Sequence, residues 1–473
     1  MNYLTSTSTM INAPATDLSC ANTTADATGL VGALARRELS ALELCNAAIA
    51  RIEQRDGAIN AVVVRDFERA REQARAADVA LEAGERRPLL GLPMTVKESF
   101  NVAGLPTSWG FERARDLRPT EDAVAVARLK AAGAVILGKS NVPVGLADWQ
   151  TVNPIHGRTV HPLDASRTPG GSSGGAAAAL ASGMVALELG SDIGGSIRVP
   201  AHFCGVFGHK PSHGLLPSRG HDFPGAVRGD SGAPDALSVI GPLARSARDL
   251  DLALGVLAGP DLDRGAYRLE LPASRCAGAA QARVLVLGSH PSARVSDAIG
   301  SALQAAAHGL AREGAKVQDG RARLPDLAAL HGAYQAALFA VISRGMPAET
   351  LPPVISAHGW LGLLDERARL QARFRELFEA WDMILMPAFG TVAFKHVDEP
   401  AWGRRVLPID GHDTPYGDQS AWAGIASFVG LPATVAPVAT NPEGLPIGVQ
   451  IVGPMFGDRT TIAAAGWLGT LRR

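Results

Sequence analysis

The residues that build disulfide frameworks, metal centres and membrane spans are scarce in this sequence of 473 residues. Its twelve histidines form no HExxH motif, and no apolar run is long enough to cross a bilayer. The four cysteines are far apart and form no CxxC pair; they are Cys20, Cys45, Cys204 and Cys276. We therefore expect no disulfide framework, no zinc site of clustered ligands and no membrane span.

The sequence also has no excess of positive or negative charge. Lysine and arginine number 45 against 46 aspartates and glutamates, so the net charge of −1 indicates neither a nucleic-acid nor an acidic-membrane partner. Residues 1–28 are polar and rich in serine and threonine, without the basic and apolar regions of a signal peptide. We expect a cytoplasmic protein with a polar N-terminal tail over residues 1–28. Only six residues are lysines, so a lysine in an apolar setting is conspicuous.

What the chain does contain is an alternation of helix and strand patterns. Ser40 and Glu43 fit a capping box before a helical apolar repeat, and residues 122–133 also predict a helix. Helix is likewise predicted around Val295, Ile299 and Leu310. Apolar runs predict strands in six places: residues 92–97, 134–138, 184–192, 282–289, 382–387 and 447–453. Residues 203–214 suggest a helix end followed by a turn. This alternation predicts an α/β fold, and the absence of a linker favours one large domain.

Two turns rich in serine and glycine follow one another, at residues 168–179 and 191–198. The first has no lysine after its glycines, which excludes a phosphate-binding loop. It does satisfy the GxSxG pattern of a nucleophile elbow, but without the apolar strand that should precede one. A purely structural tight turn before a helix is the other interpretation, and this turn alone does not decide between them.

The second turn has a clearer chemical meaning. An apolar strand leads into Ile193, Gly194, Gly195 and Ser196. Successive backbone N–H groups in such a turn form a nest that binds an anion or the oxyanion of a tetrahedral intermediate. Ser196 would then be a nucleophile beside its own oxyanion hole.

A serine nucleophile needs a base. The histidines nearest in sequence, His202, His209 and His213, fit structural roles better. Lys97 ends an apolar strand, and burial lowers the pKa of a lysine enough to make it a base. The competing interpretation of Lys97 is a surface lysine at a strand end.

Taken together, three segments resemble the amidase signature family: residues 91–100, 170–183 and 190–212. The resemblance runs from about residue 30 to the C-terminus and is weakest over residues 267–380. It implies one domain over residues 29–473, with a twisted mixed β-sheet covered by helices on both faces. It also implies hydrolysis of a small amide by acyl transfer to serine, without metal or cofactor. Family members are often dimers, which makes a homodimer the partner to test.

The resemblance assigns roles to individual residues. Ser196 matches the acylated nucleophile, Lys97 the base, and Ser172 the serine between them, which follows a cis Gly171–Ser172 bond. The Ser172 hydroxyl is expected to contact both the Lys97 amine and the Ser196 hydroxyl. The remaining matches are the oxyanion-hole residues Ile193, Gly194, Gly195 and Ser196, the supporting residues Ser173, Asp192 and Arg198, and the acyl-pocket residues Leu146, Trp149 and Gln150. A position in the hydrophobic core is the other interpretation of Trp149.

Three alternatives stay open for the function. The first is a glutaminase subunit that passes ammonia to a partner in tRNA-dependent amidation. The second is a carbamoyl-type hydrolase acting on a compound such as allophanate. The third is a non-catalytic binding protein, against which the complete set of Lys97, Ser172 and Ser196 argues.

Overall fold

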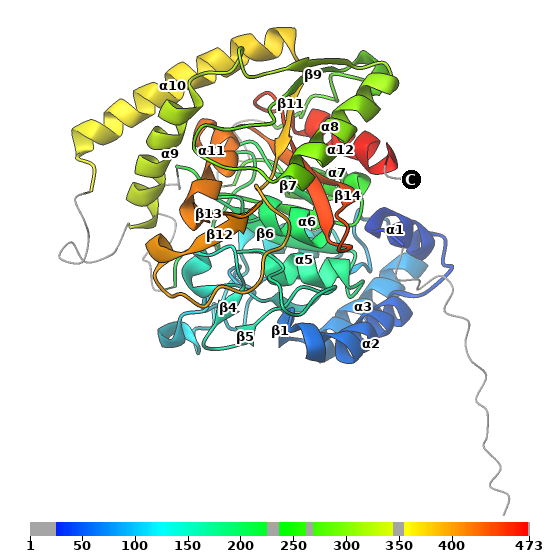
Figure 1. Cartoon of the computed structure of the whole chain (residues 1–473). Coiled ribbons are helices and arrows are strands. Elements are labelled where there is room, and N and C mark those ends of the chain that lie inside the picture. Colours follow the sequence, from blue (N-terminus) through cyan, green and yellow to red (C-terminus); the bar gives the residue numbers. More distant parts are fainter. Residues whose placement is uncertain (1–24, 225–235, 262–267, 344–353, 472–473) are drawn as a thin grey trace, which may run out of the picture.

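A mixed sheet of 11 strands forms the centre of the computed structural model, which describes residues 25–224, 236–261, 268–343 and 354–471 (Figure 1). β2 pairs in parallel with β3 and β6, and β9 with β10 and β11, whereas the other neighbours are antiparallel. Across the sheet the strands are β1 (Val62–Arg65), β3 (Val135–Ser140), β2 (Pro93–Lys97), β6 (Leu187–Asp192), β8 (Val239–Ala244), β7 (Phe207–Lys210), β14 (Ala433–Thr440), β15 (Pro446–Val452), β11 (Met383–Pro387), β9 (Arg283–Val286) and β10 (Lys316–Asp319).

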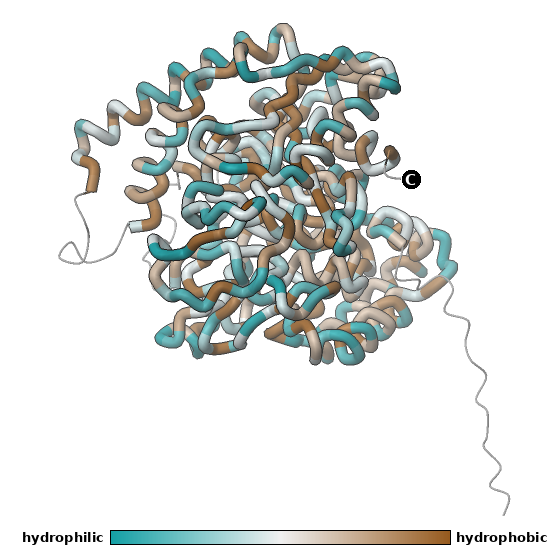
Figure 2. Tube along the Cα trace, in the orientation of Figure 1, coloured by the Kyte–Doolittle hydropathy of each residue, from teal (hydrophilic) through white to brown (hydrophobic). Residues whose placement is uncertain are grey.

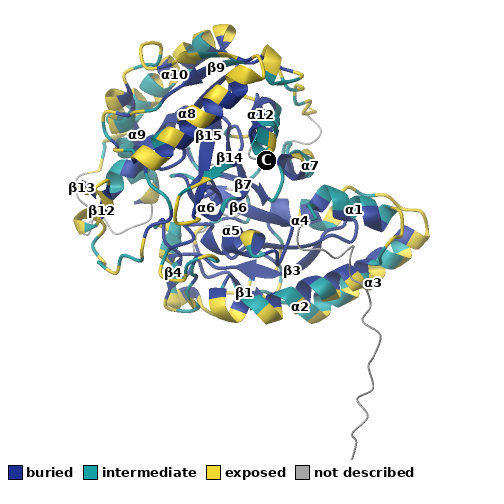
Figure 3. Cartoon of the chain, turned by 45° about the vertical axis from the view of Figure 1, so that its right-hand side comes forward, coloured by how far each residue is buried: buried dark blue, intermediate teal, exposed yellow. Residues whose placement is uncertain are grey.

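The inner strands are covered on both faces. Every residue of β2, β6, β8, β11 and β15 is buried, which requires packing above and below the sheet. Figure 3 shows β6 and β15 among the buried strands at the centre, with exposed residues on the outer turns of α8 and α10. The helices are α1 (Ala27–Ala35), α2 (Ala41–Ile59), α3 (Phe67–Glu82), α4 (Val124–Ala131), α5 (Gly174–Ala181), α6 (Arg198–Cys204), α7 (Ala247–Leu257), α8 (Asp297–Arg312), α9 (Leu327–Ile342), α10 (Ala357–Ala380), α11 (Ser420–Val429) and α12 (Asp458–Leu471).

The α/β fold expected from the sequence is confirmed. The capping box of α2 is present, with Ser40 and Glu43 each accepting a hydrogen bond from the backbone of the other. Hydrophilic residues line the outer turns of α10, whereas hydrophobic residues mark the middle of the molecule (Figure 2). Two small two-stranded sheets complete the fold, β4 (Val152–Asn153) with β5 (Gly157–Arg158), and β12 (Val406–Ile409) with β13 (His412–Pro415).

Three local expectations differ from the structure. Residues 203–214 were expected to hold only a helix end and a turn, but residues 207–210 form β7 between β8 and β14. Val295 precedes α8 instead of belonging to it, because Ser296 caps the helix. The helix α1 begins at Ala27, two residues inside the expected tail, since the Asp26 side chain caps it. The rest of that tail, residues 1–24, lies outside the described residues.

The sheet places the sequence motifs at one edge. Lys97 ends β2 and Asp192 ends β6, and these two strands run parallel to each other. Parallel strands bring their carboxyl ends to the same edge, where α/β proteins commonly bind ligands. The loop before α5 and the turn before α6 meet at this edge, because the backbone N–H of Ser173 donates a hydrogen bond to the carbonyl of Ser196 at 3.1 Å.

Within the described parts of the chain, three further observations concern metals, thiols and membranes. No group of three or more histidine, cysteine or acidic side chains is arranged to hold a metal ion. Cys45, Cys204 and Cys276 are free and buried, and Cys20 lies outside the described residues. None of the described helices combines the length and apolarity needed to cross a bilayer.

Candidate active site

Lys97 lies wholly inside the protein. Its side chain has no exposed surface, and its Nζ donates hydrogen bonds to the hydroxyls of Ser172 at 2.6 Å and Ser191 at 2.9 Å. Burial lowers the pKa of Lys97 to about 7, although the negative charge of Asp192 acts in the opposite direction. The competing interpretation, a surface lysine, is therefore wrong. An amine with this pKa can accept a proton near neutral pH.

Ser172 is held in a crowded loop before α5. The Gly171–Ser172 peptide is cis, as expected. A Cβ atom at Gly171 would lie 2.4 Å from the carbonyl oxygen of Asp148 and 2.7 Å from that of Gln150, so the loop requires glycine there. Residues 168–173 form no strand, and the nucleophile-elbow interpretation therefore lacks the strand on which it depends.

Ser196 lies in the turn between β6 and α6 with 6% of its surface exposed. Of the two contacts expected for the Ser172 hydroxyl, the one to Lys97 is present. No hydrogen bond joins the hydroxyls of Ser172 and Ser196 among the described residues, so the second expectation is wrong for this structure. Hydrogen bonds of a catalytic relay are often long or misaligned until substrate is bound, which accounts for the difference.

A buried ion pair fixes the turn that carries Ser196. The Asp192 carboxylate accepts hydrogen bonds from the backbone N–H groups of Gly195 at 2.9 Å and Ile197 at 3.0 Å. It also accepts two from the Arg198 guanidinium, at 2.7 Å from Nη2 and 3.0 Å from Nε. Burial alone would raise the pKa of Asp192, but the charge and hydrogen bonds of Arg198 outweigh it and lower the pKa to about 2. Asp192 therefore remains ionised and holds the turn at several points.

Replacing Arg198 by leucine is expected to lower the free energy of unfolding by about 3–5 kcal/mol, because Asp192 would remain buried without its partner. Urea unfolding measures this loss. Arg36→Leu is the matched control, since it breaks an ion pair with Glu38 in which both side chains are exposed, and exposed pairs contribute about 0–1 kcal/mol. Equal losses of unfolding free energy in the two variants would contradict a stabilising role for the buried Asp192–Arg198 ion pair.

Some backbone N–H and carbonyl groups of the turn form hydrogen bonds within the protein, and others are open, that is, without a described partner. All three carbonyls of residues 193–195 accept hydrogen bonds: Ile193 from the Tyr334 hydroxyl at 3.1 Å, Gly194 from Trp149 Nε1 at 2.9 Å, and Gly195 from the Val199 N–H at 2.7 Å. The N–H of Gly195 donates to Asp192, so it is not open to a ligand as the sequence suggested. The N–H groups of Ile193, Gly194 and Ser196 bond to no described residue. Gly195 has φ +96°, and such a left-handed residue in the turn lets neighbouring N–H groups converge as in a nest.

Trp149 is a buried member of an aromatic cluster. Its ring centroid lies 5.1 Å from those of Phe389 and Tyr416 and 5.3 Å from that of Trp402. Only 4% of its surface is exposed, and its indole N–H donates to the carbonyl of Gly194. The side chain thus contacts the turn that carries Ser196 through a hydrogen bond.

The other two residues expected to line an acyl pocket differ in their surroundings. The Gln150 amide exchanges two hydrogen bonds with the backbone of Val397, each 2.9 Å long, so its polar atoms are already used. Leu146 is half-buried at the end of a short 3₁₀ turn (Val144–Leu146). Of the two, Leu146 retains a surface that a ligand can contact.

The histidines considered as bases are engaged elsewhere. His202 Nδ1 accepts the N–H of Gly448 at 2.7 Å and its Nε2 lies 3.0 Å from the carbonyl of Thr391. Burial lowers the pKa of His202 to about 4. Both nitrogens of His209, in β7, contact other side chains, those of Thr434 and Asp458. Lys97 is therefore the best-placed base.

Two residues at the site were not anticipated from the sequence. Ser191, the second partner of Lys97, belongs to the same motif as Ser196, so its position in the motif was an available signal. Tyr334 contacts the turn from α9, in the segment where the resemblance is weakest. A lone tyrosine in an apolar helix gives no sign of such a contact.

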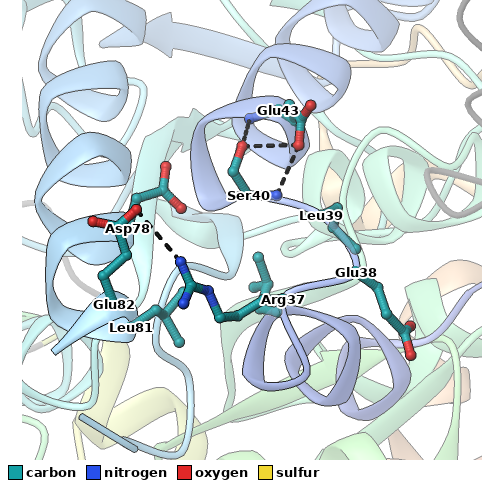
Figure 4. Close-up of a pocket in the computed structure, with 9 residues that line it drawn as sticks. Arg37, Glu38, Leu39, Ser40, Glu43, Asp78, Leu81 and Glu82 are labelled. Carbon is teal, nitrogen blue, oxygen red and sulfur yellow. Dashed lines mark hydrogen bonds and ion pairs between the residues drawn. The ribbon is translucent and has the colours of Figure 1, made fainter. Parts of the chain in front are cut away.

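A pocket of about 360 Å³ lies away from this site, between the α1–α2 junction and α3 (Figure 4). Its charged side chains are largely paired with each other or with helix ends: Arg37 lies 3.6 Å from Glu82, and Asp78 accepts N–H groups at the start of α2. None of the residues expected at the active site lines this pocket.

Comparison with known proteins gives consistent matches. The chain matches the family model described as Amidase over residues 43–350 and 353–462. It is 32% identical to fatty-acid amide hydrolase 2 of Homo sapiens over 489 residues, covering 92% of this chain and 86% of that protein. It is also 32% identical to a glutamyl-tRNA(Gln) amidotransferase subunit of Roseiflexus castenholzii, covering 91% and 92%. The solved structure of 6-aminohexanoate cyclic dimer hydrolase complexed with substrate has a TM-score of 0.79 and 25% identity, covering 95% and 97%.

Proposed function

Since this chain belongs to the amidase family, we propose that it is a serine-dependent hydrolase that cleaves a carboxylic amide by transferring the acyl group to Ser196. The observation that carries the proposal is the buried Lys97 amine 2.6 Å from the Ser172 hydroxyl, at the sheet edge that also holds Ser196. The products are a carboxylic acid and ammonia or an amine. No metal or organic cofactor enters the mechanism.

In the acylation step, neutral Lys97 takes the proton of the Ser172 hydroxyl while Ser172 takes that of Ser196. The Ser196 oxygen attacks the amide carbonyl and forms a tetrahedral intermediate. The oxyanion of this intermediate accepts hydrogen bonds from the open backbone N–H groups of the turn, which belong to Ile193, Gly194 and Ser196. When the C–N bond breaks, Ser172 gives its proton to the leaving nitrogen and regains one from Lys97.

In the deacylation step the same relay acts on water. Ser172 accepts a proton from a water molecule and passes its own proton to Lys97. The water oxygen then attacks the acyl-Ser196 ester. Collapse of the second tetrahedral intermediate releases the acid, and the proton returns to Ser196 through Ser172. Asp192, Arg198 and Ser173 support this chemistry by holding the turn, as their hydrogen bonds indicate.

The acyl group of the substrate is proposed to be apolar or aryl. Leu146 supports this, since its apolar side chain is half-buried and lies three residues before Trp149 in the chain. A fatty-acid amide hydrolase is one of the relatives, which is consistent with an apolar acyl group. Another relative belongs to a tRNA-dependent amidotransferase, so the second candidate function is that of a glutaminase subunit.

A panel of amides tests the function. We propose measuring ammonia or amine release from butyramide, benzamide, malonamide, allophanate and glutamine. Faster cleavage of butyramide or benzamide is expected. Cleavage of glutamine alone, together with a co-purifying partner chain, would instead favour the glutaminase subunit. No cleavage of any amide and no labelling of Ser196 would leave only a binding protein.

Replacement of Ser172 by alanine is expected to slow acylation by about 10²–10⁴-fold, the usual contribution of a positioned proton transfer. Lys97 retains its hydrogen bond to Ser191 in this variant, so the fold should persist. Stopped-flow measurement of acylation with p-nitrobutyranilide gives the rate. Ser182→Ala, at the far end of α5, is the control and should react like the wild type. A near-normal rate for Ser172→Ala would contradict the relay.

A further inference from the structure

Tyr334 reaches the catalytic turn from α9, far along the chain. The side chain has no exposed surface, and its hydroxyl donates a hydrogen bond to the carbonyl of Ile193 at 3.1 Å. Burial raises the pKa of Tyr334 above its ordinary value, so the phenol keeps its proton and remains a donor. The contact therefore persists across the pH range in which the enzyme would work.

The geometry of a peptide bond gives this contact a consequence on the other side of the turn. The carbonyl of Ile193 and the N–H of Gly194 belong to one trans peptide, in which they point in opposite directions. A hydrogen bond that holds the carbonyl toward α9 thus turns the N–H of Gly194 away from α9. This N–H is one of the open donors of the turn, so its direction matters for any oxyanion bound there.

The neighbouring peptide is restrained differently. Its carbonyl, that of Gly194, accepts from Trp149, and its N–H, that of Gly195, donates to Asp192. That peptide is fixed at both ends and has no open donor. Among the described residues, by contrast, Tyr334 makes the only hydrogen bond to the Ile193–Gly194 peptide.

The tyrosine ring itself has little freedom. A Cβ atom at Gly424 in α11 would lie 2.6 Å from Tyr334 Cδ1, so the backbone of α11 packs directly against the ring. A Cβ atom at Gly194 would lie 3.3 Å from the Tyr334 hydroxyl. The phenol is thus confined between α11 and the turn, and a confined donor positions its acceptor more firmly than a mobile one.

We propose that Tyr334 is a positioning residue that directs the N–H of Gly194 at the oxyanion of the tetrahedral intermediate. The inference rests on the proposed function, since it assumes that the turn binds an oxyanion. Tyr334 touches neither substrate nor the reacting atoms. It acts through the Ile193–Gly194 peptide, and it should matter more for the transition state than for bound substrate.

Tyr334→Phe removes the hydroxyl and keeps the ring. We expect kcat for p-nitrobutyranilide to fall about 10–100-fold with an unchanged KM, a smaller loss than the about 10²–10³-fold seen when an oxyanion donor is removed outright. The second-order rate of Ser196 labelling by an alkyl fluorophosphonate should fall in the same proportion, and the pH profile should not move. Incorporation of 4-aminophenylalanine at position 334, which restores a donor, should recover much of the rate.

The matched control is Tyr416→Phe. Tyr416 is equally buried and donates one hydrogen bond, to Asp148 Oδ1 at 2.7 Å, but it does not hydrogen-bond the catalytic turn. Tyr416→Phe loses a hydrogen bond to a carboxylate, so it should lose at least as much stability in urea as Tyr334→Phe, which loses one to a neutral carbonyl. Only Tyr334→Phe should react slowly. Equal labelling rates in the two variants, or a fall in kcat that 4-aminophenylalanine does not reverse, would overturn the inference. Absence of any Ser196 adduct in the wild type would instead overturn the proposed function.

Discussion

Replacement of Ser196 by alanine is expected to abolish both amide hydrolysis and covalent labelling by an organofluorophosphonate. The turnover rate should fall by about 10⁴-fold or more, because the nucleophile of a triad cannot be replaced by its partners. Binding and the open N–H groups of the turn would leave only a slow residual rate. The variant should fold normally, since the Ser196 hydroxyl makes no hydrogen bond to a described residue.

The site of labelling decides whether this interpretation is right. Peptide mass mapping of the wild-type adduct should place it on Ser196. Ser218→Ala is a suitable control, because Ser218 lies beyond β7 outside the proposed machinery and its loss should leave labelling intact. An adduct on Ser173 or Ser218 would contradict the assignment of the nucleophile.

The parts of the site that the sequence predicted well are those set by local patterns. The apolar run of β2 dictates burial, and Lys97 is the residue with which that run ends, so its location followed from the order of residues. The cis Gly171–Ser172 bond was expected from a specific resemblance. In the same way, the serine caps of α2, α7, α8 and α10 each accept a hydrogen bond from the backbone N–H three residues further on.

The parts that the sequence did not predict depend on partners distant in the chain. β7 contains Gly208, His209 and Lys210, which give no apolar alternation, and it is a strand because β8 and β14 pair with it. Trp149 was expected either to face an acyl group or to lie in the core, and its contacts with Phe389 and Tyr416 favour the core. Such packing is set by tertiary contacts, which override local preference.

The same limit applies to hydrogen bonds. The sequence presents Gly195 as one of four equivalent donors, and only the position of the Asp192 carboxylate shows that its N–H is occupied. It also gives no reason to connect Tyr334 with Ile193. A donor's partner is chosen by three-dimensional proximity, so the open N–H groups of the turn could be identified only after the fold was known.

The last expected result concerns the charge on Lys97. A base works only when it is unprotonated, and burial lowers the pKa of Lys97 to about 7. Below that pH the amine is an ammonium and cannot take the proton of Ser172. Above that pH it is neutral. We therefore expect kcat/KM to rise tenfold per pH unit on the acid side, bend near pH 7 and level off above it.

Lys97→Met keeps much of the side-chain volume and removes the amine, which separates the effect of the base from that of packing. We expect a loss of about 10⁴-fold in kcat/KM, to the residual level that binding and the oxyanion hole supply, and no bend near pH 7. Burial also lowers the pKa of Lys139, to about 8. The Lys139 amine donates to the hydroxyl of Thr107 at 2.8 Å and contacts no serine of the proposed triad. Lys139→Met should therefore keep the bend. A bend that survives in Lys97→Met but vanishes in Lys139→Met would show that Lys139 causes the pH dependence, and would contradict the role of Lys97 as the base.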